Sequence, residues 1–236
     1  MSLPNPFPQT LTQKEFKAKK AGTNGSHVFL IVDESGSMSN LRTDTIGGIN
    51  TLIKEQAKDD IHTNLTIIKF EGGDVKVPVS GFNVKEMKEF HDYKPSGSTN
   101  LLDAIGFAFE RINDILGSLK KKERPSIFIQ IITDGYENSS HKFTRQQIKN
   151  MVEKAESSDW VLSFVGANID SFAESSSFGF NQNNTANYSA NKTYDAYSTI
   201  STSLSRMKGM RSVGISASAI YSSGSVYTAE DRNDLE

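Results

Sequence analysis

Short, mostly apolar segments alternate with longer amphipathic ones along this chain, and that alternation limits the folds open to it. Apolar runs at residues 27–33, 127–133 and 159–165 have the composition of strands buried on both faces. Segments 40–58 and 101–119 place apolar residues at helical spacing. Strands separated by helices of this length indicate βαβ units with right-handed crossovers. We therefore predict an α/β fold with a doubly wound, mostly parallel sheet and helices on both faces.

Two further strands are predicted next to each other, at residues 65–70 and 75–79. The turn sequence between them, Glu71-Gly-Gly-Asp, indicates a hairpin, and Pro78 suits an edge strand because it cannot donate a ladder hydrogen bond. The sheet should therefore carry one antiparallel edge. The remaining predicted elements are a helix that begins with the capping-box pair Thr144 and Gln147, a short helix at 169–180, a short strand at 185–189 and an amphipathic helix through 196–207.

Composition divides the chain into three parts. Residues 1–26 combine three prolines with a lysine-rich run and are typical of an N-terminal arm. Residues 27–209 contain the alternating elements and form the predicted domain. Residues 210–236 are rich in serine and end in acidic residues, so we expect a tail that is solvated or ordered by a partner.

Charge and composition exclude several classes of protein. The chain has 236 residues with 26 Lys and Arg against 28 Asp and Glu, so it lacks the basic excess of a nucleic-acid-binding protein. It contains no cysteine, which excludes disulfides, thiolate zinc sites, iron–sulfur clusters and cysteine nucleophiles. No stretch approaches the roughly 20 apolar residues of a membrane span, and the first residues lack a signal-peptide core. We expect no membrane partner and a cytoplasmic location.

Oxygen-bearing side chains follow the predicted strands, where ligands bind in open α/β sheets. Asp33, Ser35 and Ser37 come after the first strand, Thr99 precedes the 101–119 helix, and Asp134 ends the 127–133 strand. One or two carboxylates with neutral oxygens make the usual shell of a hard divalent ion such as Mg²⁺. Gly36 allows the backbone a close approach within the first loop.

Each of these segments also has a structural interpretation that needs no ligand. The Asp33-Glu-Ser-Gly-Ser loop can be an N-cap or Asx turn before a helix, and Thr99 and Asn100 can cap the next one. Asp134-Gly135 can be turn chemistry alone. The joint appearance of all three, in order and beside the expected elements, favours a site.

This set of residues resembles the von Willebrand factor type A family, whose metal-ion-dependent adhesion site reads D-x-S-x-S, then a distant Thr and a distant Asp. All five positions match, and the similarity spans residues 27–209. The resemblance implies a Rossmann-like fold and a metal site of Asp33, Ser35, Ser37, Thr99 and Asp134. In it the serine hydroxyls bind the ion directly and the others bind directly or through water. The implied ion is Mg²⁺, with Mn²⁺ and Ca²⁺ as alternatives.

The resemblance also implies a function. In this family the ion keeps one position that a partner's Asp or Glu carboxylate fills, so we expect a protein-binding module without catalysis, in an intracellular setting or a phage or bacterial assembly. One alternative is a structural subunit of a larger particle that binds through its arm and tail. Another is a metal-dependent hydrolase or phosphotransferase that uses Asp33, although Ser35 stands where a second acid would be needed.

Other polar and aromatic residues are expected to be structural. Glu34 should point away from the site if its neighbours point in, and Met38 should pack at the helix start. Glu137 and Asn138 either border the metal or belong to a solvated loop. The remaining expectations concern sets of residues: surface or strand-edge positions for His27, His62, His91 and His141, a solvated loop opposite the site for Lys120, Lys121, Lys122 and Arg124, and core packing for Trp160, Phe164, Phe172, Phe178 and Phe180.

Overall fold

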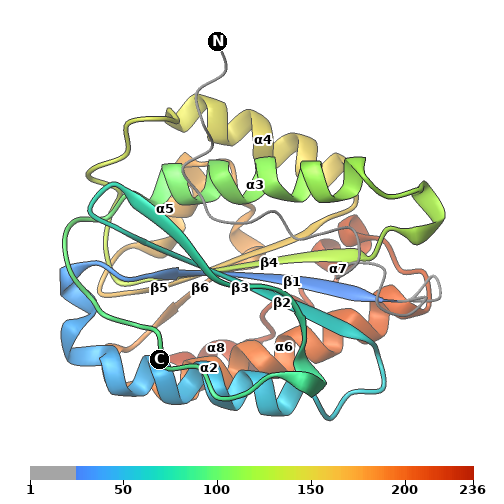
Figure 1. Ribbon diagram of the computed structural model, residues 1–236, viewed down its shortest axis with the longest axis horizontal. Helices are drawn as coiled ribbons and strands as arrows, with labels where there is room; N and C mark the ends of the chain where they lie inside the picture. The colour runs from blue at the N-terminus through green and yellow to red at the C-terminus, as the bar shows by residue number, and fades with distance from the viewer. Residues whose placement is uncertain (1–24) are drawn as a thin grey trace.

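A six-stranded sheet in the order β3-β2-β1-β4-β5-β6 forms the middle layer of the domain (Figure 1). The computed structural model describes residues 25–236. The strands are β1 (Ser26–Asp33), β2 (Thr63–Glu71), β3 (Asp74–Asn83), β4 (Ser126–Thr133), β5 (Val161–Ala167) and β6 (Thr185–Tyr188). All neighbouring strands are parallel except β2 and β3, which form the antiparallel edge. The predicted fold class is confirmed.

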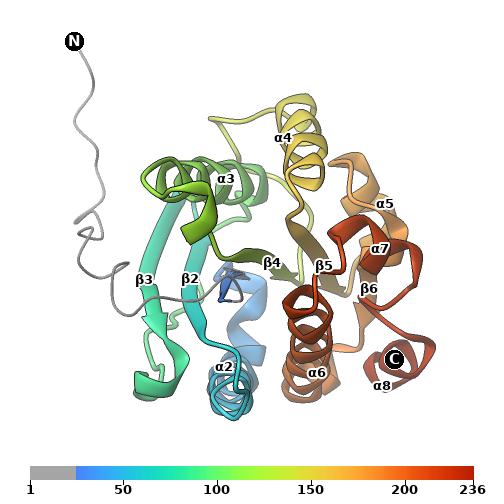
Figure 2. The same cartoon turned by 90° about the vertical axis from the view of Figure 1, so that its right-hand side faces the viewer.

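Helices cover both faces of this sheet (Figure 2). The α-helices are α2 (Arg42–Gln56), α3 (Leu101–Gly117), α4 (Arg145–Ser157), α5 (Ser171–Ser177), α6 (Thr193–Ser212), α7 (Ala217–Ser222) and α8 (Ala229–Leu235). Short 3₁₀ turns are η1 (Gly36–Leu41), η2 (Val84–Glu86), η3 (Lys121–Glu123), η4 (Gln182–Asn184) and η5 (Ala190–Lys192). Helices α3, α4 and α5 lie on one face, and α2, α6 and α8 lie on the other. Among the described residues, no helix is long and apolar enough to cross a membrane.

Two hydrophobic cores result, one on each side of the sheet. Strand β1 contributes to both, because successive side chains of a strand point to opposite faces. Leu30 and Val32 join the core beneath α2 and α6, whereas Phe29 and Ile31 join the core beneath α3 and α4. The whole of β1 is buried, which explains its continuous apolar sequence.

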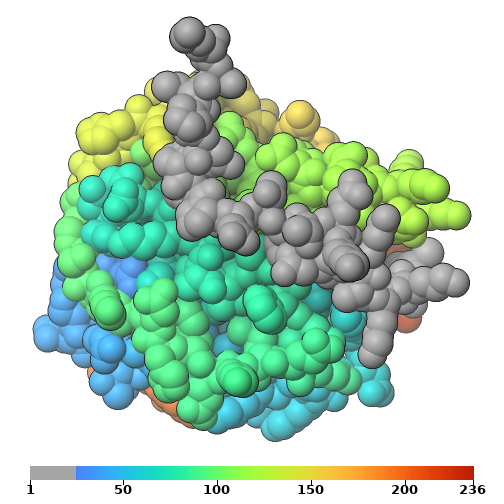
Figure 3. Space-filling view, in the orientation of Figure 1, coloured from blue at the N-terminus to red at the C-terminus, as the bar shows by residue number. Residues whose placement is uncertain are grey.

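The edge hairpin occupies one face of the molecule. Strand β3 and the segment that follows it, blue-green to green in Figure 3, form much of the surface seen there. Pro78 lies in β3, as the sequence predicts for an edge strand. Gly72 and Gly73 form the turn with positive φ angles of 53° and 93°, which favour glycine.

The C-terminal segment differs from the expected solvated tail. Helix α6 continues to Ser212, and the residues after it form α7 and α8. The segment contributes to the core beneath α6 the buried side chains of Ala217, Ile220, Tyr221, Val226, Tyr227 and Leu235. Two short helices hold too few turns to show a periodicity, and their polar residues serve as caps: the Ser216 side chain accepts from Ala219 N. The predicted arm, residues 1–26, lies outside the described residues except for its last two positions.

His27 also differs from expectation, since its side chain is fully buried rather than at the surface or a strand edge. It is the second residue of β1, which lies between β2 and β4 and therefore has a neighbouring strand on each side. Its ring stacks on Phe29 with a centroid distance of 4.1 Å, and Nε2 lies 2.8 Å from Thr66 Oγ1. A single histidine in an apolar run carried no signal of this burial.

Candidate metal centre

The carboxyl end of β1 positions the first group of candidate ligands. Strand order reverses here: the chain leaves β1 for β2 on one side and later returns as β4 on the other, which creates the crevice where such folds bind ligands. The Asp33 carboxylate accepts hydrogen bonds from Ser35 N at 2.7 Å and from Thr133 Oγ1 at 2.5 Å. The Ser35 and Ser37 hydroxyl oxygens lie 3.1 Å apart. Turn η1 therefore gathers both serines beside Asp33.

Asp134, at the end of β4, meets this loop directly. The Ser37 hydroxyl donates to Asp134 Oδ1 at 2.6 Å, across 97 positions of sequence. Both carboxylates are buried, Asp33 fully and Asp134 with 7% of its surface exposed. Four of the five predicted ligands are thus linked through short contacts.

Thr99 is brought to the same place by a loop before α3. Its backbone N donates to Asn138 Oδ1 at 2.9 Å, and its carbonyl accepts from Asn138 N at 3.0 Å. A Cβ atom built on Gly135 would lie 3.0 Å from Thr99 Oγ1 and 3.9 Å from Asp33 Oδ2. Gly135 thus lies beside both the threonine hydroxyl and the Asp33 carboxylate, and its lack of a side chain leaves room for the hydroxyl.

Burial controls the charge of the two carboxyl groups. It raises the pKa of Asp33 to about 6, against hydrogen bonds from Thr133 and Ser35 that lower this pKa and with a small further increase from the negative charge of Asp134. Burial likewise raises the pKa of Asp134, against the hydrogen bond from Ser37. Two adjacent buried carboxylates are costly to keep charged without a cation. The site is therefore electrostatically suited to a positive ion.

The donor set fits a hard divalent cation. It offers two carboxylates and three hydroxyls, all oxygen ligands of the kind that Mg²⁺ and Mn²⁺ take. In the part of the chain that the structure describes, no three His, Cys, Asp or Glu side chains gather to hold an ion. An ion at this edge would thus depend on the hydroxyl oxygens as much as on the acids.

The structure agrees in part with the interpretation of these loops as helix caps and turns. Ser35 and Asn100 occupy N-cap positions, yet neither side chain makes a capping hydrogen bond. The Asp33 carboxylate does accept from the amide two residues on, as in an Asx turn. The turn therefore shapes the loop, while the serine and threonine hydroxyls are left to other contacts.

Glu137 and Asn138 do not form a simple solvated loop, because both make hydrogen bonds to the segment at the start of α3. The Glu137 carboxylate accepts from the backbone N of Leu102, at the start of α3, at 2.8 Å, and from those of Ser139 and Ser140. Asn138 holds Thr99, as described above. Both residues thus fix the loop after β4 against the beginning of α3.

Sequence reasoning missed two residues that contact Asp33 and one that pairs with its neighbour Glu34. Thr133 donates to its carboxylate, and the buried Tyr93 hydroxyl donates to its backbone carbonyl. Lys69 is buried beside the loop and pairs with Glu34. Only Thr133 had a sequence signal, its place directly before Asp134, whereas Tyr93 and Lys69 are distant in sequence.

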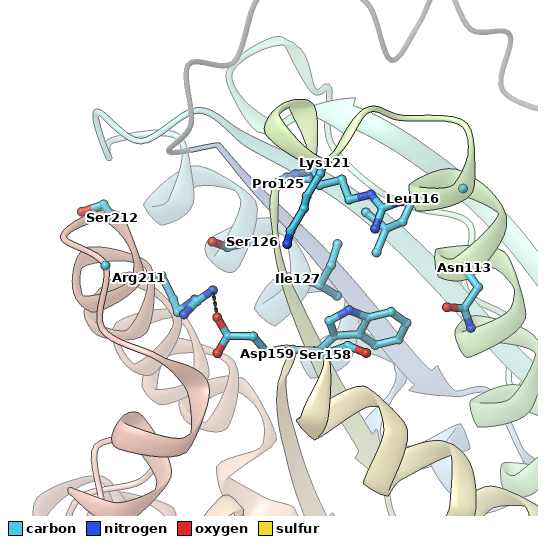
Figure 4. Close-up of a pocket in the computed structure, with 14 residues that line it drawn as sticks. Asn113, Leu116, Lys121, Pro125, Ser126, Ile127, Ser158, Asp159, Arg211 and Ser212 are labelled. Carbon is cyan, nitrogen blue, oxygen red and sulfur yellow. Dashed lines mark ion pairs between the residues drawn. The ribbon is translucent and has the colours of Figure 1, made fainter.

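A cavity of about 650 Å³ lies at the amino ends of strands β4 and β5, opposite the end that holds the candidate metal centre. The residues that line it include Leu116, Lys121, Ile127 and Trp160 (Figure 4). The Arg211 guanidinium forms one wall and pairs with Asp159 at 2.5 Å. Turn η3, which contains the lysine run, is exposed at this end. It is therefore remote from the candidate metal centre, as the sequence predicts.

Comparison with solved structures identifies the fold. The pilus adhesin SpaC from Lactobacillus rhamnosus GG matches with a TM-score of 0.62 and 11% identity, covering 78% of this chain and 31% of that one. A von Willebrand factor type A protein from Catenulispora acidiphila matches with a TM-score of 0.54 and 12% identity, covering 78% and 43%. Proximal thread matrix protein 1 from the mussel byssus, in a structure with a zinc-occupied MIDAS motif, matches with a TM-score of 0.53 and 12% identity, covering 74% and 46%.

This chain spans less than half the length of each of these solved chains. No protein-family profile and no curated protein matches its sequence. At such identities the likeness concerns the fold, which is that of von Willebrand factor type A domains.

Proposed function

We propose that this domain is a metal-dependent protein-binding module. Asp33, Ser35, Ser37, Thr99 and Asp134 would hold a divalent ion, Mg²⁺ in the first place, and an Asp or Glu carboxylate of a partner protein would complete its coordination. The observation that carries the proposal is the convergence of three distant loops at the strand-order reversal, with Ser37 Oγ 2.6 Å from Asp134 Oδ1.

The composition of the site favours docking over tight enclosure of the ion. Two carboxylates balance the charge of a dication, and the other three groups are neutral hydroxyls. A hard ion held in this way still attracts an external anion, whereas a site crowded with carboxylates would not. The solved neighbours with this fold include a pilus adhesin and a protein with a zinc-occupied MIDAS motif, which supports the same kind of site here.

Calorimetric titration with Mg²⁺ and Mn²⁺ tests the site itself. The whole chain is compared with Asp33→Ala and with Ser39→Ala, a matched control in the same loop whose exposed hydroxyl donates to Gly36 O. We expect saturable binding that is lost in Asp33→Ala and kept in Ser39→Ala. Equal binding by all three proteins would contradict the assignment.

A second experiment tests whether a partner protein docks on the ion. Partners captured by the whole chain in Mg²⁺ are compared with those captured in the presence of a chelator and by Asp33→Ala. We expect a protein that binds only when both the ion and Asp33 are present, and whose affinity falls when its contacting acid is changed to Asn or Gln. A partner bound equally well by Asp33→Ala would remove the metal from the interface.

A further inference from the structure

A buried ion pair lies directly behind the candidate metal loop. Glu34 follows Asp33 in sequence, and its carboxylate lies 2.8 Å from Lys69 Nζ. Their side chains are only 2% and 3% exposed. Burial of two charges costs free energy that their attraction barely offsets, so a pair of apolar side chains is often as stable. The ion pair therefore calls for an explanation other than stability.

The contacts of the pair supply one. Glu34 Oε1 also accepts from Lys94 N at 2.5 Å. Lys69 Nζ donates to the Asp92 carbonyl at 2.6 Å and pairs with the Asp92 carboxylate at 3.3 Å. The Glu34 carbonyl accepts from Ser96 N at 2.8 Å. Glu34 and Lys69 together thus fasten the segment 92–96, which leads to Thr99.

We propose that Glu34 and Lys69 are positioning residues for the metal centre: they hold the loop of Thr99 against the loop of Ser35 and Ser37. This inference rests on the proposed function. Hydroxyl ligands donated by separate loops bind an ion well only if the loops are already in place, because ordering them would otherwise oppose binding. Removal of outer supports of metal ligands typically lowers metal affinity 10- to 100-fold.

The pair has a second effect on the site. The positive charge of Lys69 offsets the buried negative charge of Glu34, and Lys69 also pairs with the exposed Asp92 carboxylate. Loss of Lys69 alone would leave Glu34 buried and unpaired, with a cost to the fold that has nothing to do with the metal. A test must therefore replace both residues together.

The decisive variant is Glu34→Leu/Lys69→Leu. Two apolar side chains can fill the buried space, and Asp92 and Lys94, which lose their partners, are exposed residues that water can reach. We expect this variant to unfold near the wild-type urea midpoint but to bind Mg²⁺ or Mn²⁺ 10- to 100-fold more weakly by calorimetry. A purely structural pair predicts the reverse: metal affinity unchanged in any variant that folds.

A matched control exists at the amino end of β2, away from the candidate metal centre. Lys208, fully buried, pairs with Asp59 at 2.8 Å and also donates to Thr63 Oγ1, at the start of β2. The double variant Asp59→Ala/Lys208→Leu removes a second ion pair, between a buried lysine and a half-buried aspartate, far from the metal loops. We expect its metal affinity to match the wild type. An equal loss in both double variants would overturn the positioning role.

Hydrogen exchange on the metal-free protein provides a readout that does not depend on metal binding. The Lys94 amide, which donates to the Glu34 carboxylate, should exchange slowly in the wild type and faster in Glu34→Leu/Lys69→Leu. Unprotected exchange of this amide in the wild type would refute the positioning role of the Glu34 side chain. If the wild type binds no ion, the proposed function fails and this inference with it. If it binds one and the double variant binds equally tightly, only the inference fails.

Discussion

Protonation of His27 should make acidification destabilise this fold. Its side chain is fully buried in β1 and bonded to Thr66. Burial lowers the pKa of His27 to about 3, with a smaller contribution from the positive charge of Arg111. The folded protein therefore keeps this imidazole neutral at pH values where an exposed histidine is protonated.

The sign and size of the effect follow from linkage. In the unfolded chain a histidine has a pKa of about 6.5. Between pH 6.5 and pH 3 the unfolded state binds a proton that the folded state does not, so the free energy of unfolding falls as the pH falls. The stabilisation is complete above pH 6.5. At about 1.4 kcal/mol per pH unit, its loss between pH 7 and pH 5 is about 2 kcal/mol.

Urea denaturation of the wild type and of His27→Gln at pH 7, 6 and 5 measures this quantity. Glutamine has a similar length and no titratable group, so the variant should lose about 2 kcal/mol less than the wild type over this range. Other titratable groups contribute equally to both proteins, so their contributions cancel in the difference. They include Asp33, whose raised pKa increases the free energy of unfolding as the pH falls. Parallel pH profiles would refute the reasoning.

Three substitutions test the packing and the capping of helices by urea midpoint. Gly48→Ala in α2 places a Cβ 2.4 Å from a ring carbon of Tyr197 and should cost about 2 kcal/mol, since overpacking forces neighbours to move. Gly117→Ala, in α3, meets nothing within 4 Å and should instead add up to about 0.5 kcal/mol through helix propensity; a loss there would contradict the open space. Thr144→Ala removes the cap on Gln147 N and should cost about 1 kcal/mol, which Thr144→Ser should largely restore.

Much of the architecture was predictable because it depends on local patterns. The continuous apolar sequence of β1 and the helical spacing of apolar residues in α3 indicate directly which side chains are buried. The Thr144 capping box is also present as expected. Element ends were less accurate. Strand β5 begins at Val161 rather than 159, because Asp159 adopts a left-handed φ of 67° at the end of α4. Such a conformation is unusual for a residue other than glycine and has no sequence signature.

The candidate ligands could be named from sequence, but their support could not. Asp33 and Asp134 end strands, so parallel pairing alone brings them to one edge. The partners of Glu34 depend on how far the loop after β3 reaches across the sheet, and nothing in the residues around Lys69 specifies that path. The burial of Leu235 was unreadable for the same reason: it results from long-range packing, not from periodicity.

The position of α8 has a consequence for self-association. Strand β6 is the outer strand of the sheet, and α8 covers it: the Arg232 guanidinium donates to the carbonyls of Thr185 and Asn183, and Ser189 N donates to Leu235 O. The other outer strand, β3, is guarded differently, by Pro78 and by irregularities in its pairing with β2.

Unprotected outer strands invite pairing with a strand of another molecule, and natural sheets block them by such means. A chain that ended before α8 would present the free backbone of β6 to its neighbours. Helix α8 thus protects the outer strand β6 from pairing with another molecule and so from aggregation.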